Sequence, residues 1–394
     1  TLISVEEALA RVLALSAALP PESVPLRSAA GRVLAEPVAA RLSQPPFPAS
    51  AMDGYAIRDA DHANGKTLTV IGEAGAGHAF AGALAPGQAV RIFTGAPVPE
   101  GADRVVLQED VTRSGDSITL TGSLESGTNI RPVGQDFRKG DLLSAPRRLR
   151  PADLALIASM NHPTVSVARK PVVAFLATGD ELVMPGETPR PDQIVASNSF
   201  ALAALAEAAG AEARLLPIAR DNDTALRYAF GLAEGADVIV TIGGASVGDH
   251  DLVGKIATEL GLERAFWKIA MRPGKPLMAG RLGRAIMLGL PGNPVSAIVC
   301  AHLFLLPLLT QMQGLVGRHE TRMARLGAPV DANGPRTHYM RARLEPGEGL
   351  PTLTPFDRQD SALLSILSEA DALLIRPIGD GPLPARSLVS YLPL

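Results

Sequence analysis

The sequence predicts a multidomain α/β plus β protein, built around a parallel-sheet α/β domain with helices on both faces. Its 394 residues exceed the roughly 250–300 at which one hydrophobic core stops growing, so several domains are expected. Between residues 170 and 312, apolar runs of strand length alternate with helical segments, as in a parallel sheet that is covered on both faces. Elsewhere, short β-rich runs are broken by Gly and Pro, which is typical of small β domains.

These changes in the pattern of apolar, helical and β-rich segments along the chain predict four domains. Residues 1–43 and 140–168 carry helical segments and flank the β-rich residues 44–139. We therefore expect a discontinuous helical linking domain with an inserted, mostly antiparallel β domain. Residues 169–315 form the α/β domain, and residues 316–394 form a C-terminal small β domain that resembles a barrel.

Charge, cysteine content and hydropathy exclude several classes of function. The 37 basic and 40 acidic residues leave a net charge of −3, so no nucleic-acid partner is expected. The one cysteine, Cys300, lies in an apolar run, which excludes a disulfide within the chain and predicts a buried thiol. The apolar run 295–309 is shorter than a membrane span, and the first residues carry no signal-peptide pattern. We expect a cytoplasmic protein with no membrane partner.

The chemistry is predicted at the carboxyl ends of the parallel strands, where open α/β sheets bind their ligands. Glycine lets the backbone approach a phosphate or oxyanion closely, and carboxylates are hard oxygen ligands that suit Mg²⁺. Four predicted strands are followed by such loops: Gly179-Asp180-Glu181, then Arg220-Asp221 with Asp223, then residues 243–251 (GGASVGDHD), and Pro291-Gly292-Asn293.

Each loop alone has a simpler interpretation. A single Gly–Asp after a strand is usually a turn, and Asp221 and Asp223 are equally well explained as N-caps of the following helix. Four such loops at one edge of one sheet nevertheless favour a ligand site over four unrelated turns.

One loop also fits a different enzyme class. Gly244, Ser246 and Gly248 match the G-x-S-x-G nucleophile elbow of α/β serine hydrolases, with His302 and His319 downstream. This alternative leaves the other three loops and the β domain unexplained. The double glycine and the paired aspartates of residues 243–251 also suit a phosphate-and-metal loop better.

The β-rich part has dense motifs of its own, around Asp53 (SAMDGYA), Thr94 (TGAPVPEGAD) and Asp136 (NIRPVGQD). Together with PPF, ATGDEL, GGASVGDHD, RPGKP and GLPGNPVSA, they resemble the molybdopterin molybdenumtransferase family, which includes the C-terminal part of gephyrin. The matching segments span residues 44–297 in the family's order, and the flanking parts agree with its four-domain layout.

The resemblance implies a transferase that inserts molybdenum from molybdate into adenylylated molybdopterin, releases AMP and forms the molybdenum cofactor. It implies Mg²⁺ as cofactor, an elongated homodimer with an inter-subunit active site, and a molybdopterin adenylyltransferase as upstream partner. The catalytic residues that it implies are Asp53, Thr94, Asp136, Glu181, Asp221 and Asp251, of which Glu181, Asp221 and Asp251 are the metal ligands. The implied substrate-binding residues are Gly179, Asp180, Asn198, Gly243, Gly244, Ser246, Gly248, Arg272, Lys275, Pro291, Gly292 and Asn293.

Three positions depart from the family pattern. Pro48-Ala49 replaces a polar Asp-Asn pair, Ala245 replaces valine, and Asp360 precedes Ser361 where glycine is frequent. The last departure leaves open what the C-terminal domain contributes to the site. A non-catalytic scaffolding paralogue is the alternative function, and molybdate and tungstate fit the pattern equally.

Overall fold

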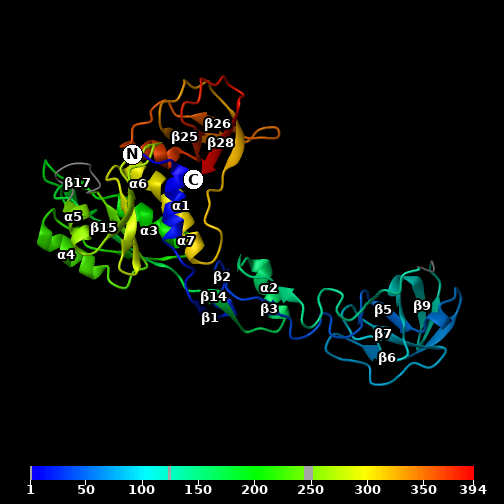
Figure 1. Ribbon diagram of the computed structural model, residues 1–394. Helices are drawn as coiled ribbons and strands as arrows, with labels where there is room; N and C mark the ends of the chain where they lie inside the picture. Colours follow the sequence, from blue (N-terminus) through cyan, green and yellow to red (C-terminus); the bar gives the residue numbers. More distant parts are fainter. Residues whose placement is uncertain (1, 123–125, 244–251) are drawn as a thin grey trace. The chain divides into compact units, whose positions relative to one another are not determined.

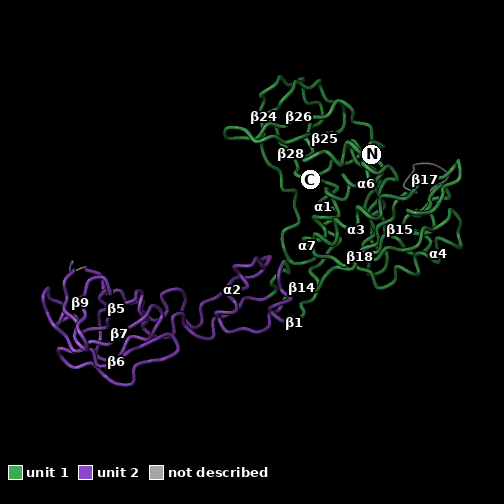
Figure 2. Tube along the Cα trace, turned by 180° about the vertical axis from the view of Figure 1, so that it is seen from behind, with its two compact units in different colours: residues 1–22, 31–35, 167–394 green, residues 23–30, 36–166 purple. Residues whose placement is uncertain are grey.

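The computed structural model describes residues 2–122, 126–243 and 252–394. The chain divides into two units, drawn in green and purple in Figure 2. This division is coarser than the four predicted domains, whose boundaries stay a prediction. Unit 1 comprises Thr1–Glu22, Gly31–Ala35 and Val167–Leu394, and unit 2 comprises Ser23–Ala30 and Glu36–Ser166.

The centre of unit 1 is a sheet whose described strands follow the order β18-β15-β19-β23-β22-β20. The first four pair in parallel, as predicted, whereas β22 and β20 pair antiparallel at one edge. The sequence prediction missed this edge because a short turn at Gly283, with φ +60°, joins two apolar runs as a hairpin. The strands are β15 (Val172–Ala177), β18 (Glu212–Leu215), β19 (Val238–Ile242), β20 (Glu263–Trp267), β22 (Met278–Leu282) and β23 (Ala285–Leu290).

Helices cover both faces of this sheet (Figure 1). Alternate residues of β15 point into two separate cores: Val173 and Phe175 into one, Ala174 and Leu176 into the other. Burial on both faces explains why the strands are continuous apolar runs. One face carries α1 (Val5–Ala14), α3 (Asn198–Ala208), α6 (Pro294–Cys300) and α7 (Leu306–Met312), and the other carries α4 (Asp223–Leu232) and α5 (Leu252–Glu259).

Helix α1 differs from the predicted grouping, which places residues 1–43 with residues 140–168. It begins after Ser4, whose Oγ accepts the N–H of Glu7 at 3.1 Å, as the capping pattern predicts. Its apolar face packs in the first core of unit 1, and burial of such side chains is worth about 1.5–3 kcal/mol each for the larger ones. The buried residues of that face are Val5, Ala8 and Val12.

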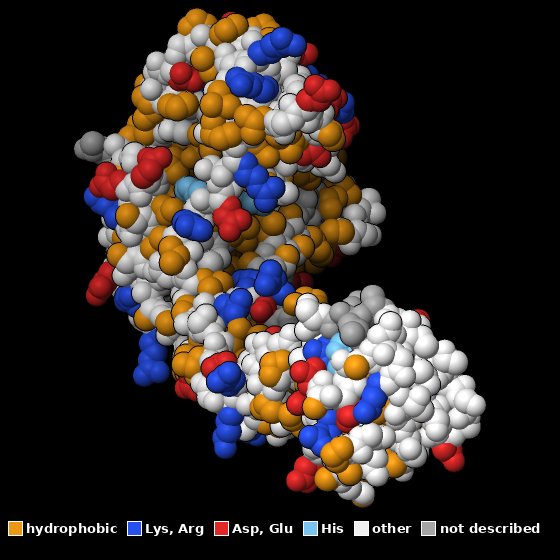
Figure 3. All heavy atoms as spheres, turned by 90° about the vertical axis from the view of Figure 1, so that its right-hand side faces the viewer, with side chains coloured by type: hydrophobic (Ala, Val, Ile, Leu, Met, Phe, Trp, Pro, Cys, Tyr) orange, Lys and Arg blue, Asp and Glu red, His pale blue; other side chains and the backbone are white. Residues whose placement is uncertain are grey.

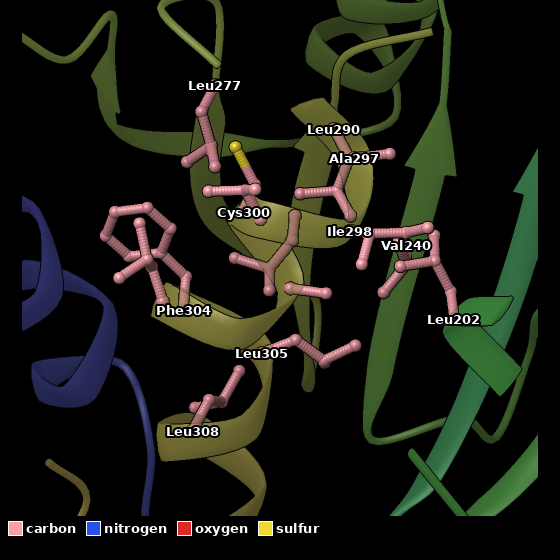
Figure 4. Packing of buried hydrophobic residues seen from close by; sticks show 14 of the residues in the cluster. Leu202, Val240, Leu277, Leu290, Ala297, Ile298, Cys300, Phe304, Leu305 and Leu308 are labelled. Carbon is pink, nitrogen blue, oxygen red and sulfur yellow. The ribbon is translucent and has the colours of Figure 1, made fainter. Parts of the chain in front are cut away.

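The longest apolar segment is a core helix. Pro294–Met312, in which α6 and α7 are joined by the π-helical η4 (Ala301–Leu305), is long and apolar enough to cross a membrane by length and composition alone. Most of it is buried inside unit 1, and Figure 4 shows Cys300 and Phe304 among the apolar side chains of the core. Cys300 is the buried thiol that the sequence predicts, and burial raises the pKa of this thiol.

The C-terminal part of unit 1 is a closed five-strand barrel, which confirms the predicted barrel-like domain. The strands follow the order β25-β26-β24-β28-β27, and β27 closes the barrel by pairing with β25. A short strand from the α/β part, β21 (Met271–Arg272), pairs in parallel with β25. The remaining elements are β24 (Arg322–Leu326), β25 (Thr337–Glu345), β26 (Thr352–Pro355), α8 (Leu364–Glu369), β27 (Ala372–Arg376) and β28 (Leu388–Pro393).

Unit 2 contains the β-rich sheet that the sequence predicts, in the order β8-β5-β7-β6-β10-β9 among the described strands. Gly54 in β5 is required there, because a Cβ would lie 2.9 Å from the carbonyl carbon of Val106. The sheet strands are β5 (Gly54–Ile57), β6 (Thr67–Ala74), β7 (Gln88–Ile92), β8 (Arg104–Leu107), β9 (Val111–Ser114) and β10 (Ser117–Leu120). Smaller elements are β3 (Val38–Ala39), β4 (Ala49–Ser50), β11 (Ile130–Arg131), β12 (Leu142–Leu143), β13 (Arg147–Arg148) and α2 (Pro151–Ser159).

Further short strands lie outside the two large sheets and the barrel. Strand β1 (Pro21–Pro25) follows the segment after α1, and β2 (Val33–Leu34) pairs with β14 (Thr164–Ala168). In the α/β part, β16 (Leu182–Val183) and β17 (Ile194–Val195) form a small parallel pair. On the face that Figure 3 shows, acidic and basic side chains are interspersed.

Candidate active site

A cavity of about 980 Å³ lies at the carboxyl ends of the parallel strands of unit 1, at the sheet edge where the sequence predicts a ligand site. The loops after β15, β18, β19 and β23 all contribute to its wall. The cavity thus brings together predicted residues from five separate segments of the chain: these four loops and the start of α3. Those that line it are Gly179, Glu181, Asn198, Asp221, Gly243, Pro291, Gly292 and Asn293.

Arg220 fastens the loop after β15 to the loop after β18. Its Nη1 donates to the carbonyl oxygens of Gly179 at 3.4 Å, Asp180 at 3.1 Å and Leu182 at 3.2 Å. These three carbonyls surround Glu181, so the position of the Glu181 backbone depends on the guanidinium of Arg220. Arg220 is therefore a positioning residue for a carboxylate of the cavity.

Asp180 supports the second carboxylate instead of lining the cavity itself. Its Oδ1 accepts the backbone N–H of Asp221 at 3.1 Å. The alternative that Asp221 or Asp223 caps α4 is wrong, because Asn222 is the N-cap and accepts the N–H of Ala225 at 2.8 Å. The carboxylate of Asp221 is therefore not used as a helix cap and is a wall residue of the cavity.

Gly179 and Gly243 provide space in this site, because their N–H groups are already hydrogen-bonded within the fold. The N–H of Gly179 donates to Ala219 O at 3.1 Å, and that of Gly243 donates to Leu290 O at 3.2 Å. Gly179 has φ +148°, and a Cβ there would lie 2.7 Å from the carboxyl carbon of Glu181. The Glu181 carboxylate thus folds over a position that only glycine leaves open.

Two carboxylates, those of Glu181 and Asp221, line the cavity, and this number suits Mg²⁺, because the ion usually takes one or two protein carboxylates and keeps water or phosphate oxygens. Residues 2–122, 126–243 and 252–394 contain no group of three His, Cys, Asp or Glu side chains that could hold a metal ion. The third predicted ligand, Asp251, lies outside the described residues, as do Gly244, Ser246 and Gly248.

The C-terminal part of unit 1 supports the wall of the cavity through Ser361, which contacts the wall residue Asn293. The Nδ2 of Asn293 donates to Ser361 Oγ at 3.0 Å, while the Nδ2 of Asn198 donates to Gly292 O at 2.7 Å. Asp360, the departure from the family pattern, accepts a backbone N–H within its own turn and leaves this contact in place. The contribution of the last domain, which the sequence left open, is the support of Asn293.

One basic side chain reaches the cavity from helix α5, a residue that the sequence prediction did not include. Lys255 in α5 lines the cavity. The predicted anion-binding residues Arg272 and Lys275 are exposed, and the adjacent Pro276 is the cavity-lining member of that segment. Arg272 lies on β21, opposite His338 of the barrel.

Unit 2 joins two of its three predicted catalytic residues. Asp53 Oδ1 accepts both the backbone N–H and the hydroxyl of Thr94, each at 2.8 Å. The pKa of Asp53 lies below its ordinary value. The largest cause is the hydrogen bond from the backbone of Thr94, the second is the bond from its hydroxyl, and the charge of Arg91 adds to the lowering. Asp136 is exposed in a separate turn, where its N–H donates to Gln44 O at 3.0 Å.

Comparison with known proteins decides the family. Residues 3–161 match the MoeA N-terminal region (domain I and II), residues 174–311 a probable molybdopterin binding domain, and residues 323–394 the MoeA C-terminal region (domain IV). The molybdopterin molybdenumtransferase of Nostoc sp. is 37% identical over 372 residues, which cover 91% of this chain and 85% of the relative. This chain belongs to the molybdopterin molybdenumtransferase family.

Other members agree over the full length. The molybdopterin molybdenumtransferase of Bacillus subtilis is 34% identical over 391 residues, 96% of this chain and 91% of the relative. A crystal structure of the molybdopterin biosynthesis moeA protein from Pyrococcus horikoshii is similar with a TM-score of 0.86 and 31% identity, and the match covers 100% of this chain and 99% of that chain. The predicted fold class is thereby confirmed.

The chain belongs to the molybdopterin molybdenumtransferase family, so the serine hydrolase alternative is no longer needed to explain its motifs. The two histidines do not support a hydrolase either. His302 lies in the π-helical η4 of the core, where burial lowers its pKa to about 4. The Nε2 of His319 lies 2.7 Å from Leu303 O, within hydrogen-bonding distance. Ser246, the nucleophile of that alternative, lies outside the described residues.

The sequence prediction missed four residues of this site: Arg220 as a clamp, Lys255, Ser361 as a partner of Asn293, and Thr178. A signal was present for two of them. Thr178 precedes Gly179 in the motif ATGDEL, and Lys255 lies one helical turn beyond the GGASVGDHD loop. The contacts of Arg220 and Ser361 depend on the tertiary fold and have no local signature.

Proposed function

We propose that this chain is a molybdopterin molybdenumtransferase: it inserts molybdenum from molybdate into adenylylated molybdopterin, releases AMP and forms the molybdenum cofactor. The observation that carries the proposal is the cavity at the strand ends, where Glu181 and Asp221 are fixed by interlocked loops. The match to family members over nearly the whole chain supports it.

The residues of the cavity suit the cleavage of a phosphoanhydride. We infer that Glu181 and Asp221 hold Mg²⁺, which when bound supplies positive charge for the anhydride oxygens. Cleavage consumes one water: its oxygen bonds to one phosphorus, the bridging oxygen leaves with the other, and a carboxylate accepts the proton. Lys255 lines the same cavity and provides a positive charge for the phosphoryl oxygens.

Molybdate needs a different environment, because carboxylates alone repel an oxyanion. The fixed charges of Arg272 and Lys275 are the proposed anion-binding groups, and their segment reaches the cavity through Pro276. These roles rest on the family's motif and on the position of the segment beside the cavity.

The decisive experiment incubates purified protein with adenylylated molybdopterin, molybdate and Mg²⁺ and measures AMP release. We expect turnover by the wild type and a large loss in Glu181→Gln, which removes a charge from the cavity but keeps the shape of the side chain. A folded wild type that binds the substrate without releasing AMP would instead favour the scaffolding paralogue.

We further propose a cytoplasmic homodimer whose active site uses residues of both subunits. In support, the predicted catalytic residues are divided between two units of the chain, Asp53 in unit 2 and Glu181 in unit 1. An adenylyltransferase acting on molybdopterin must supply the substrate, since the proposed reaction consumes an adenylylated pterin. Sedimentation at micromolar concentration tests the assembly, and an active monomer would contradict it.

Replacement of Arg220 by lysine is expected to lower kcat about 10-fold or more, because small displacements of catalytic groups are costly. Lysine keeps the charge, but its compact ammonium does not reproduce the planar guanidinium that contacts three carbonyls. AMP release and thermal unfolding are the measurements. Arg227→Lys is the matched control, since Arg227 pairs with Asp223 and Glu259 on the surface. Equal kcat values for the two variants would contradict the role of Arg220 in positioning the loop of Glu181.

Replacement of Thr94 by valine is expected to raise the pKa of Asp53 towards its ordinary value. The variant keeps the backbone donor, the larger cause of the depression, and loses the hydroxyl, the second cause. A depressed carboxyl pKa keeps Asp53 ionised at lower pH, so the acid limb of the kcat/KM profile should move to higher pH in the variant. Thr94→Ser keeps the hydroxyl and should retain the wild-type limb. An unchanged limb in Thr94→Val would show that ionisation of Asp53 does not control activity.

A further inference from the structure

Two threonine hydroxyls on neighbouring strands lack hydrogen-bond partners among the described residues. They are the Oγ1 atoms of Thr178, directly after β15, and of Thr241 in β19. Their residues are only 4% and 1% exposed. An unpaired buried hydroxyl destabilises a folded protein, so each of the two needs an explanation.

The surroundings of the two hydroxyls differ in one respect. Thr178 is a wall residue of the cavity, whereas Thr241 is not among the residues that line it. Beside Thr178 lies Gly243, with φ +89°, where a Cβ would fall 3.4 Å from Thr178 Oγ1. Gly292 adds a second position without a side chain next to Gly243. The two glycines place no side chain against the Thr178 hydroxyl, which is itself buried in the wall of the cavity.

Three backbone donors at this place are already engaged in the sheet and its loops. The N–H of Thr178 donates to Ile242 O at 3.1 Å, and the N–H groups of Gly179 and Gly243 donate to Ala219 and Leu290. The two carboxylates of the cavity are acceptors when ionised. A ligand oxygen that reaches the Thr178 hydroxyl therefore finds a donor for which no described residue provides an acceptor.

We propose that the hydroxyl of Thr178 is a substrate-binding group that donates a hydrogen bond to an oxyanion oxygen of the substrate. The oxygen belongs to a tetrahedral oxyanion, either the phosphoryl group of the adenylylated pterin or molybdate. This inference rests on the proposed function, because it assigns one more contact to the same cavity. The unpaired hydroxyl is a stability cost in the free protein that the ligand removes.

The proposal makes stability and binding change in opposite directions. Thr178→Val keeps the shape of the side chain and removes the unpaired hydroxyl, so the unfolding temperature should stay equal or rise. Affinity for the oxyanion should fall about 10-fold or more, because hydrogen bonds to charged groups are among the stronger ones. Thr241→Val is the matched control: it should stabilise in the same way without any change in affinity. Thr178→Ser keeps a hydroxyl and should bind nearly as the wild type does.

The experiment uses the purified full chain with Mg²⁺ and measures binding of AMP and of molybdate by calorimetry, together with thermal unfolding. Weaker binding of AMP alone in Thr178→Val assigns the hydroxyl to the phosphoryl group, and weaker binding of molybdate alone assigns it to molybdate. Unchanged binding of both, equal weakening in Thr178→Val and Thr241→Val, or a wild type that binds neither would overturn the proposal. AMP release by the wild type is measured in parallel: its absence despite oxyanion binding would overturn the proposed function, not the Thr178 contact.

Discussion

Mixing the two inactive variants Asp53→Ala and Glu181→Ala is expected to restore AMP release, up to about half of the wild-type rate per heterodimer if the sites act independently. Each homodimer carries the same lesion in both of its sites and should be inactive. In a heterodimer with an inter-subunit active site, both lesions fall into one site and the other is intact. Asp53 and Glu181 lie in different units of the chain, so this pair tests the shared site directly.

Subunit exchange must be verified, for example with two affinity tags purified in sequence. The control is a mixture of Glu181→Ala with Asp221→Ala, since both residues line one cavity of unit 1 and leave no intact site in a heterodimer built this way. Verified heterodimers of Asp53→Ala and Glu181→Ala without regained activity would refute the shared site and leave the transferase assignment standing.

Replacement of Gly179 by alanine is expected to lower kcat about 100-fold, with a loss of Mg²⁺ affinity that calorimetry detects. The new Cβ would fall 2.7 Å from the carboxyl carbon of Glu181 and force that side chain away from its place in the cavity. Backbone strain at φ +148° should add a destabilisation of about 1–3 kcal/mol.

Gly186→Ala separates the two effects of that substitution. Gly186 also has a positive φ, +94°, but a Cβ there meets nothing within 4 Å. It should therefore share the strain and the lower unfolding temperature while keeping most of the activity. If both variants lose activity equally, the displaced Glu181 carboxylate is not the cause.

The sequence predicts the fold class and the sheet edge of the site because their signals are local. Apolar runs such as that of β15 identify strands that are buried on both faces, and the carboxyl ends of parallel strands converge by geometry. The antiparallel edge strand β20 carried no such signal, and α1 joined unit 1 through a tertiary contact.

The sequence predicts the site as a set of motifs. The motifs do not show which residues line the cavity and which ones support them. The motifs suggest that the N–H groups of Gly179 and Gly243 bind phosphate, but both groups are already hydrogen-bonded within the fold. The two glycines matter because a side chain at either position would collide with its neighbours. Asp180 turned out to support Asp221, and Arg220 to hold the loop of Glu181. Such roles follow from contacts between loops that are about 40 residues apart, which no local pattern encodes.

Strand β21 has a consequence for how this architecture can be recombined. Met271–Arg272 leaves the α/β part to pair with β25 of the barrel, so the segment that carries Arg272 and Lys275 is secured by a domain that begins some 50 residues later in the chain. A fragment cut between the α/β part and the barrel would keep every strand of the large sheet, yet release this basic segment from its partner. Shuffling of the α/β module between proteins would therefore have to carry the barrel with it, or replace the basic segment by one that needs no anchor.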